Sequence, residues 1–204
     1  VEIYGVIQSP PTRAVIFVLK AIGVPYELKN IINDVTREEW KELNPQLTIP
    51  VMVDDGFVLS ESRSIMQYLV DKYAEDDPLY PKDLKARALI DARLGFDCGS
   101  WWPKVYSPIR NLIFMNKKIT EETAASMLEP LSVVEEFLSR NKWIAGPKMT
   151  IADISYFVIA TACLAFKMDL KPYPKILKWI EECKQNIRGY QLNEEGCEIF
   201  RQQF

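Results

Sequence analysis

The pattern of apolar and polar positions changes after roughly the first eighty of the 204 residues. Before that point, short apolar runs that are typical of strands alternate with segments of helical periodicity. The pattern predicts the order β-α-β-α-β-β-α, with elements at residues 2–7, 10–23, 26–32, 37–43, 51–54, 57–59 and 62–74. The last of these helices has one apolar side, formed by Ile65, Met66, Leu69, Val70 and Tyr73.

The rest of the chain has helical periodicity only. Helices are predicted at residues 84–116, 120–140, 150–166, 174–186 and 191–202. Pro130 should bound or kink the second of them. The segment 150–166 is apolar nearly all round, which predicts a buried central helix. Polar residues with two prolines separate the two patterns, so we expect an α/β domain at 1–76, a linker at 77–84 and an all-helical domain at 85–204.

Charge and hydropathy exclude several classes of partner. The net charge is −3 and basic residues never follow one another in runs of more than two, which argues against nucleic-acid binding. The longest apolar stretch, near 154–166, contains Ser and Thr and is too short to span a bilayer. No charged-then-apolar leader is apparent, and we expect a cytoplasmic protein that does not bind membranes.

The chain contains no histidine, and this absence restricts its chemistry. It excludes Ser-His-Asp and Cys-His catalysis, two-His zinc motifs and imidazole acid–base steps. Four cysteines, Cys98, Cys163, Cys183 and Cys197, are widely spaced and form no CxxC pair, so we expect packing thiols rather than a metal or dithiol site. An enzyme built from this sequence must use hydroxyls, charged groups, backbone dipoles or a thiol brought by its substrate.

Ser9 directly precedes two prolines and a predicted helix. In this place Ser most often caps the helix, with Pro in the first turn. The same geometry also suits chemistry, because a helix N-terminus favours an anion and a neighbouring hydroxyl can donate a hydrogen bond to a thiolate. No cysteine stands at position 9 or 12, so that thiol would have to belong to the ligand.

The stretch NPQLTIPVMVDDGFVLSES, residues 44–62, predicts a tight hairpin, but a hairpin does not explain all of its residues. Pro50 stands where a strand should begin, and Glu61-Ser62 follows the second strand at once. The stretch is therefore either only a well-made turn or a place where another backbone docks. In the simpler interpretation, Ser60 or Ser62 only caps the next helix.

Four motifs now stand in order: SPPTR from Ser9, NPQLTIP, LSESRSIMQYL and MTIAD. With these motifs the chain resembles the cytosolic glutathione transferases, closest to the delta and epsilon classes of arthropods. The resemblance covers essentially the whole chain. It implies a thioredoxin-like N-terminal domain, an all-α C-terminal domain and a homodimer. It also implies conjugation of the glutathione thiolate to small hydrophobic electrophiles in detoxification, including insecticide metabolism, with glutathione as co-substrate and no metal.

The resemblance also implies roles for individual residues. Ser9 is the catalytic residue that hydrogen-bonds the glutathione sulfur. The glutathione-binding residues are Leu47, Thr48, Ile49, Pro50, Glu61, Ser62 and Arg63, with a cis bond before Pro50. In this arrangement the peptide would bind by strand addition and Glu61 would accept from its ammonium group. Asp153, in Thr150-x-x-Asp153, is a structural capping residue.

The acceptor site would lie between the domains, where the candidate walls are apolar and aromatic. They are Pro11, Trp101, Trp102, Tyr106, Ile109, Arg110, Phe114 and Phe166. Aromatic residues in a helix are more often part of the core, so each assignment competes with burial. Arg110 could equally be a solvated surface residue.

The chain departs from the delta and epsilon pattern at two positions. Leu47 and, by an ungapped count, Val35 stand where histidines contact the glycine end of glutathione. Each lost hydrogen bond to a charged group costs about 1.5–3 kcal/mol, or roughly ten- to a hundredfold in affinity. Asn33, Arg37 or Lys41 could substitute. The alternative function is therefore a weakly active or inactive protein that sequesters apolar ligands. A glutaredoxin-like role is disfavoured, because Ser9 and Thr12 stand in place of cysteines.

Overall fold

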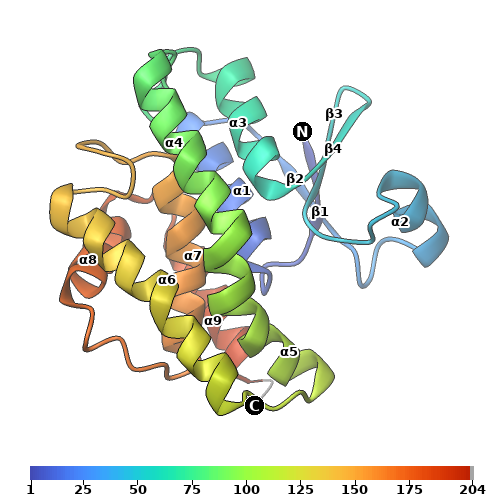
Figure 1. Ribbon diagram of the computed structural model, residues 1–204. Helices are drawn as coiled ribbons and strands as arrows, with labels where there is room; N and C mark the ends of the chain where they lie inside the picture. The colour runs from blue at the N-terminus through green and yellow to red at the C-terminus, as the bar shows by residue number, and fades with distance from the viewer. Residues whose placement is uncertain (203–204) are drawn as a thin grey trace.

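The computed structural model describes residues 1–202 and contains a small mixed sheet beside a larger group of helices (Figure 1). The first part consists of β1 (Glu2–Gly5), α1 (Pro10–Ile22), β2 (Glu27–Asn30), α2 (Arg37–Leu43), β3 (Val51–Asp54), β4 (Phe57–Ser60) and α3 (Ser62–Tyr73). The predicted order β-α-β-α-β-β-α is confirmed. The second part consists of α4 (Leu84–Phe96), η1 (Asp97–Tyr106), α5 (Ser107–Met115), α6 (Glu121–Arg140), α7 (Ile151–Ala165), α8 (Pro174–Asn186) and α9 (Gln191–Arg201).

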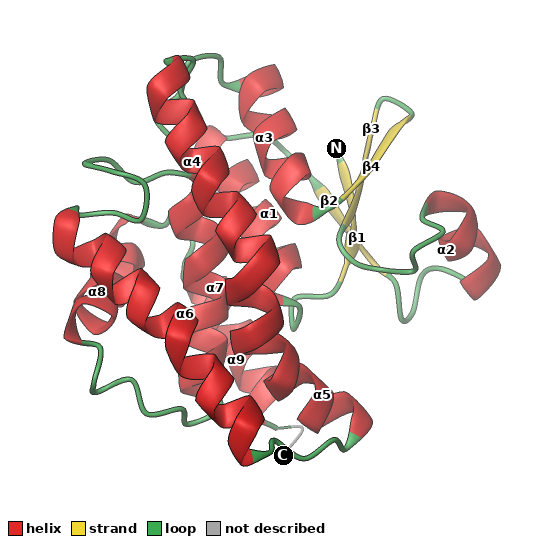
Figure 2. Ribbon diagram, in the orientation of Figure 1, coloured by secondary structure: helices red, strands yellow, loops and turns green. Residues whose placement is uncertain are grey.

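The sheet has the strand order β2-β1-β3-β4. Strand β1 runs parallel to β2 and antiparallel to β3, and β3 pairs with β4 through the predicted hairpin. In the register, Ile3 lies opposite both Leu28 and Met52, which places apolar residues side by side. Helices α1 and α3 lie between the sheet and the other helices, and α2 lies on the far side (Figures 1 and 2). This arrangement is the predicted α/β thioredoxin-like unit joined to an all-α unit.

Helix α7 is the centre of the helical part. Its residues from Ile151 to Cys163 are all buried, as the all-round apolar pattern predicted. Helices α1, α4, α8, α9 and η1 contact it. Because α1 belongs to the first part and packs on α7 as well as on α3, the two parts share one continuous core. Within residues 1–202, no helix combines the length and apolarity needed to cross a bilayer.

Asp153 fixes the start of α7. Its buried carboxylate accepts hydrogen bonds from the Ile144 amide at 2.8 Å, the Thr150 amide at 2.9 Å and the Trp179 indole at 3.0 Å. Burial raises the pKa of Asp153 to about 6, although these donors oppose the shift. One side chain thus joins the start of α7 to the preceding loop and to α8.

The segment from Leu84 to Met115 is helical throughout, but its middle is a π-helix, which the sequence pattern did not predict. The ten-residue stretch η1 contains Pro103, whose missing N–H cannot join an α-helical ladder. A π-helical register shifts the hydrogen bonds of such a segment by one residue and widens the turn. Pro130 likewise does not bound its helix, because α6 continues through it to Arg140.

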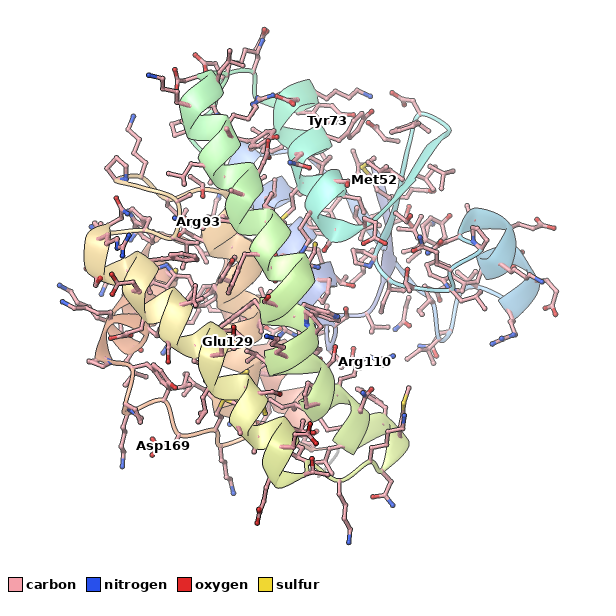
Figure 3. All side chains as sticks on the ribbon, viewed as in Figure 1. Met52, Tyr73, Arg93, Arg110, Glu129 and Asp169 are labelled. Carbon is pink, nitrogen blue, oxygen red and sulfur yellow. The ribbon has the colours of Figure 1, made fainter. Side chains whose placement is uncertain are left out.

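The predicted apolar side of α3 is correct for four residues and wrong for Tyr73. Ile65, Met66, Leu69 and Val70 are fully buried, whereas Tyr73 is 38% exposed. Its hydroxyl donates a 2.7 Å hydrogen bond to Asp54 at the end of β3, and Figure 3 shows the ring on the side of α3 nearer the hairpin. The polar end of the tyrosine therefore determines its position.

Candidate active site

Ser9 occupies the N-cap position of α1, but its side chain does not cap the helix. Its backbone is extended, with φ −76° and ψ 118°, and its amide donates to the carbonyl of Val6 at 3.1 Å. In the described part of the chain, the hydroxyl forms no capping bond and has no other hydrogen-bond partner. The commoner capping role is therefore absent. The hydroxyl lies beside the electropositive end of α1 and is available to a ligand.

The segment from Leu47 to Pro50 is held in an unusual backbone conformation. The Ile49-Pro50 peptide bond is cis, as predicted, and Leu47 has a left-handed φ of 54°. The buried Asn44 organises the turn, because its amide group donates to the Thr48 carbonyl at 2.9 Å. Neither the amide nor the carbonyl of Ile49 has a partner among the described residues. A strand-like ligand could pair with both groups.

A cavity of about 460 Å³ lies between these two features and the start of α5. Its lining residues are Val6, Gln8, Ser9, Pro10, Pro11, Leu47, Thr48, Ile49, Trp102, Tyr106, Ser107, Arg110 and Phe114. One wall thus comes from the α/β part, with exposed hydroxyl and backbone groups, and the other comes from helical aromatic residues. Arg110 is the only charged residue in the described lining, and Figure 3 shows it on the side of the helices that faces the sheet.

The helical wall follows a four-residue repeat. Trp102, Tyr106, Arg110 and Phe114 line the cavity, and Pro11 lies opposite them. Tyr106 is only 3% exposed, and burial raises the pKa of its phenol while the nearby Arg13 cation opposes this rise.

Three of the predicted wall residues do not line the cavity: Trp101, Ile109 and Phe166. Trp101 and Ile109 are fully buried away from the cavity in the same helical segment, and Trp101 stacks on Tyr156 with ring centroids 5.4 Å apart. Phe166 ends α7 and is half-buried. Adjacent aromatic residues on a helix point in different directions, so Trp101 belongs to the core and Trp102 to the cavity.

Comparisons with known proteins identify the family. The N-terminal domain model of glutathione S-transferases matches residues 3–77 and the C-terminal domain model matches residues 93–186. Glutathione S-transferase D7 of Anopheles gambiae is 38% identical over 202 residues, which cover 96% of this chain and 93% of that protein. The chain belongs to the glutathione S-transferases.

Solved structures of insect glutathione transferases agree with this assignment. A delta-class glutathione transferase of Nilaparvata lugens superposes with a TM-score of 0.92 at 36% identity, covering 99% of this chain and 97% of that one. A glutathione transferase homologue of Drosophila mojavensis, solved with bound glutathione, gives a TM-score of 0.90 at 34% identity, covering 99% and 94%. The predicted resemblance to arthropod glutathione transferases and the predicted fold are confirmed.

In this transferase, Glu61, Ser62 and Arg63 lie beside the cavity lining rather than within it. Glu61 is exposed and precedes α3 with a left-handed φ of 68°. Neither Ser60 nor Ser62 caps α3, because Glu61 occupies the cap position. The Ser62 hydroxyl, which is buried, accepts a 3.2 Å hydrogen bond from Arg63. The alternative interpretation of these serines as simple caps is therefore wrong.

Arg63 has a buried partner that the sequence did not reveal. Its Nε and Nη2 lie 2.9 and 2.8 Å from Oδ2 of Asp97, which also accepts a 2.5 Å hydrogen bond from Ser155. Burial lowers the pKa of the Arg63 guanidinium, but Asp97, together with Cys98 and Glu61, outweighs burial, so that the pKa is raised. The guanidinium carbon also lies 5.5 Å from the ring centre of Trp102, a cavity residue. Asp97 lies in η1, and no motif in the sequence around it indicates that it pairs with a residue of α3.

The two positions that depart from the transferase pattern lie in different places. Leu47 lines the cavity, whereas Val35 lines a separate hollow with Tyr4 and Glu39. None of the possible substitutes, Asn33, Arg37 and Lys41, lines the cavity. The wall contributed by the α/β part therefore has no charged side chain in its described lining.

Proposed function

We propose that this glutathione transferase conjugates the glutathione thiolate to hydrophobic electrophiles, with Ser9 as the catalytic residue. The observation that supports this proposal is the position of the Ser9 hydroxyl. It has no partner within the described residues, stands at the N-terminus of α1 and faces a cavity whose opposite wall is aromatic. A ligand thiol placed there would meet a hydrogen-bond donor and a helix dipole together.

These two effects are large enough to ionise a thiol at neutral pH. A thiol has a pKa of about 8.5, and each unit of depression requires about 1.4 kcal/mol. A hydrogen bond to a charged group contributes roughly 1.5–3 kcal/mol, and a helix N-terminus adds about 0.3–1 kcal/mol. Together they would lower the thiol pKa by about one to three units. The reaction needs no general base, which matches a sequence without histidine.

The peptide part of glutathione would bind along the Leu47–Pro50 segment. The free amide and carbonyl of Ile49 would pair with the cysteinyl residue, as in strand addition. Glu61 and Ser62, at the start of α3, would hold the γ-glutamyl end, with Arg63 supporting Ser62 through their hydrogen bond. The glutathione-bound relative from Drosophila mojavensis supports the choice of ligand.

The second substrate would occupy the aromatic side of the cavity. Trp102, Tyr106 and Phe114 offer flat apolar surfaces, and Arg110 offers one cation. A cavity of about 460 Å³ is large enough for a small aromatic electrophile. Detoxification, with insecticide metabolism as one form of it, is the role we propose. We also propose that the enzyme acts in the cytoplasm as a homodimer, on the basis of its family.

The first test measures how Ser9→Ala changes the ionisation of bound glutathione. Because the hydroxyl stabilises the thiolate, we expect the apparent pKa of the bound thiol to rise by about one to two units. The rate should fall about ten- to a hundredfold at neutral pH, and the loss should diminish as the pH approaches the new pKa. Ser132→Ala, which removes an exposed hydroxyl on α6, is the control and should leave the profile unchanged. An unaltered profile in Ser9→Ala would remove Ser9 from the mechanism.

A second function, sequestration of apolar ligands, is favoured by one observation. Leu47 contributes an apolar side chain where the peptide would end, and the α/β part contributes no charge to the described lining. Titration calorimetry with glutathione alone separates the two functions. Saturation in the millimolar range or below supports the enzyme. No binding at that concentration, together with tight binding of an apolar dye, would support the sequestering protein.

A further inference from the structure

Arg13 is a buried cation that holds the backbone in front of Ser9. It lies in the first turns of α1 and is 1% exposed. Its Nη1 donates to the carbonyl of Ile7 at 2.7 Å and to the carbonyl of Gln8 at 3.0 Å. Its own amide donates to the Ser9 carbonyl at 3.1 Å. Three consecutive carbonyls, at positions 7, 8 and 9, therefore receive hydrogen bonds from this one residue.

Helix α9 supports the guanidinium from the other side. Oδ1 of Asn193, which is fully buried, accepts from Nε of Arg13 at 3.0 Å. Nδ2 of Asn193 in turn donates to the hydroxyl of Thr161 on α7 at 3.0 Å. Both ends of the Asn193 side-chain amide are thus hydrogen-bonded, which fixes its orientation. The fixed acceptor in turn holds the Arg13 guanidinium in one orientation.

Helix α9 also touches the loop directly. A Cβ added at Gly196 would lie 2.4 Å from the carbonyl oxygen of Ile7 and 2.6 Å from Nη1 of Arg13. Such distances are shorter than any van der Waals contact, so only glycine allows α9 to approach the loop this closely. Helix α9 and the loop before Ser9 are therefore packed backbone to backbone at Gly196 and Ile7.

Arg13 has no carboxylate within ion-pair distance in the described structure. The charged and titratable groups that act on it are Cys197, whose sulfur lies 3.8 Å from Nη2, then Tyr106 and Glu194. Burial lowers the pKa of Arg13, and these groups partly restore it. Burying a cation whose partners are carbonyls and an amide costs folding free energy. Packing alone therefore does not explain why a charged residue stands at position 13. Its hydrogen bonds converge on the loop that ends at Ser9.

We infer that Arg13 is a positioning residue for Ser9, held in place by Asn193 and Gly196 of helix α9. Fixing the carbonyls of Ile7 and Gln8 fixes the peptide planes that precede Ser9, and these determine where its hydroxyl points. Loss of the support would leave the cavity walls intact but would move the donor away from the thiol. A shift of a few tenths of an ångström weakens a hydrogen bond whose strength depends on distance and angle.

The inference rests on the proposed role of Ser9. The experiment measures the apparent pKa of the bound glutathione thiol, as in the test of Ser9→Ala. Asn193→Leu removes the acceptor for Arg13, and Arg13→Lys keeps the charge but cannot form the fork. In both variants we expect the apparent pKa of bound glutathione to rise by about one unit and kcat at neutral pH to fall about tenfold. The KM for glutathione should change by no more than about twofold, because the peptide-binding segment is untouched. Asn193→Asp retains the acceptor for Nε of Arg13 but loses the donor to Thr161, so its thiol pKa and kcat should lie closer to the wild-type values than those of Asn193→Leu.

A double variant separates positioning from general destabilisation. In a Ser9→Ala background, Asn193→Leu should cause no further change in the thiol pKa, because the group that it positions is already absent. Cys183→Ala, a small buried change in α8, is the matched control and should leave the thiol pKa unchanged. If Asn193→Leu does not fold, Arg13→Lys and Gly196→Ala test the same contact.

The outcomes distinguish this inference from the proposed function. A thiol pKa that shifts in Ser9→Ala but not in folded Arg13 and Asn193 variants would overturn the positioning role alone. Equal effects of Asn193→Leu with and without Ser9 would also overturn it. A thiol pKa that is unchanged in Ser9→Ala itself would overturn both the catalytic role of Ser9 and its positioning. The positioning role of Arg13 would be supported if the thiol pKa shifts of Asn193→Leu and Ser9→Ala are non-additive and Asn193→Asp reverses part of the shift.

Discussion

Leu47 stands where the resemblance to the delta and epsilon classes predicts a histidine. Its side chain lines the cavity, and its left-handed backbone turns the loop toward the Ile49-Pro50 bond. Leucine cannot donate a hydrogen bond to a carboxylate, so the glycine end of a bound tripeptide would lack one charge-assisted contact. We therefore expect Leu47 to affect the affinity for glutathione without affecting the pKa of its thiol.

The variant Leu47→His should bind glutathione more tightly than the wild type. A histidine at this position would provide one hydrogen bond to a charged group, so Kd should fall about tenfold, while the pKa of the bound thiol should stay the same. Titration calorimetry gives the first quantity and the pH–rate profile gives the second. Val35→His is the matched control, because Val35 lines a different hollow, and it should change Kd by less than about twofold. Equal gains from the two variants would contradict the assigned geometry.

Elements are held together in this fold by a few buried polar side chains. Asp153 joins the start of α7 to the preceding loop and to Trp179 of α8. Asp97 of η1 joins α3 to α7 through Arg63 and Ser155. Such groups cannot be replaced singly, because each removal leaves donors buried without an acceptor.

Asp153→Ala should therefore destabilise the protein, and the size of the effect should depend on pH. Four donors, the amides of Ile144 and Thr150, the Thr150 hydroxyl and the Trp179 indole, would lose their acceptor, so we expect the free energy of unfolding to fall by about 3 kcal/mol or more. The folded-state pKa of about 6 exceeds the value of about 3.9 for an unfolded Asp. The folded state thus binds the proton more tightly, and the contribution of Asp153 is largest below pH ~4, declines as the pH rises toward 6 and then levels off. Urea denaturation at pH 4.5 and 7.5 should show the larger loss at pH 4.5; a larger loss at pH 7.5 would contradict this sign.

Local sequence patterns predicted most elements. They failed where tertiary contacts determine the hydrogen-bond register of a helix or which of its residues are buried. Periodicity located α2 and α8 with their observed bounds, because a cap or a proline marks their ends. It missed the π-helical register of η1, because local periodicity does not reveal which hydrogen bonds a segment with Pro103 will form. It assigned Trp101 and Trp102 to the same wall, although adjacent residues of a helix lie about 100° apart around its axis and so face different neighbours.

In the candidate site, too, some features could be predicted from the sequence and others required the structure. The cis bond before Pro50 was expected from the resemblance to the family, whereas the absence of a capping bond at Ser9 required coordinates. The pairs Arg63–Asp97 and Arg13–Asn193 join residues that are 34 and 180 positions apart. A single sequence contains no local signal for such pairs. They follow from how the helices pack.

At the scale of the whole molecule, the α/β part and the helical part should unfold as one unit. Helix α1 packs on α3 and on α7, so separating the parts would expose the apolar surface of a helix that is buried along most of its length. Trp40 reports on the first part, and Trp101, Trp102, Trp143 and Trp179 report on the second. Urea unfolding curves of a Trp40→Phe variant, followed by fluorescence and by far-UV circular dichroism, should have one common midpoint. Two separated midpoints would show that the parts unfold independently.

The contact between α9 and the loop before Ser9 has a consequence for the order of events during synthesis. Asn193 and Gly196, which support Ser9 through Arg13, are added more than 180 residues after Ser9 during synthesis. A nascent chain that lacks α9 can already contain the sheet, the cis-proline segment and the aromatic wall. Such a chain would lack the contacts that direct the serine, so we expect full catalytic competence only after α9 has been translated.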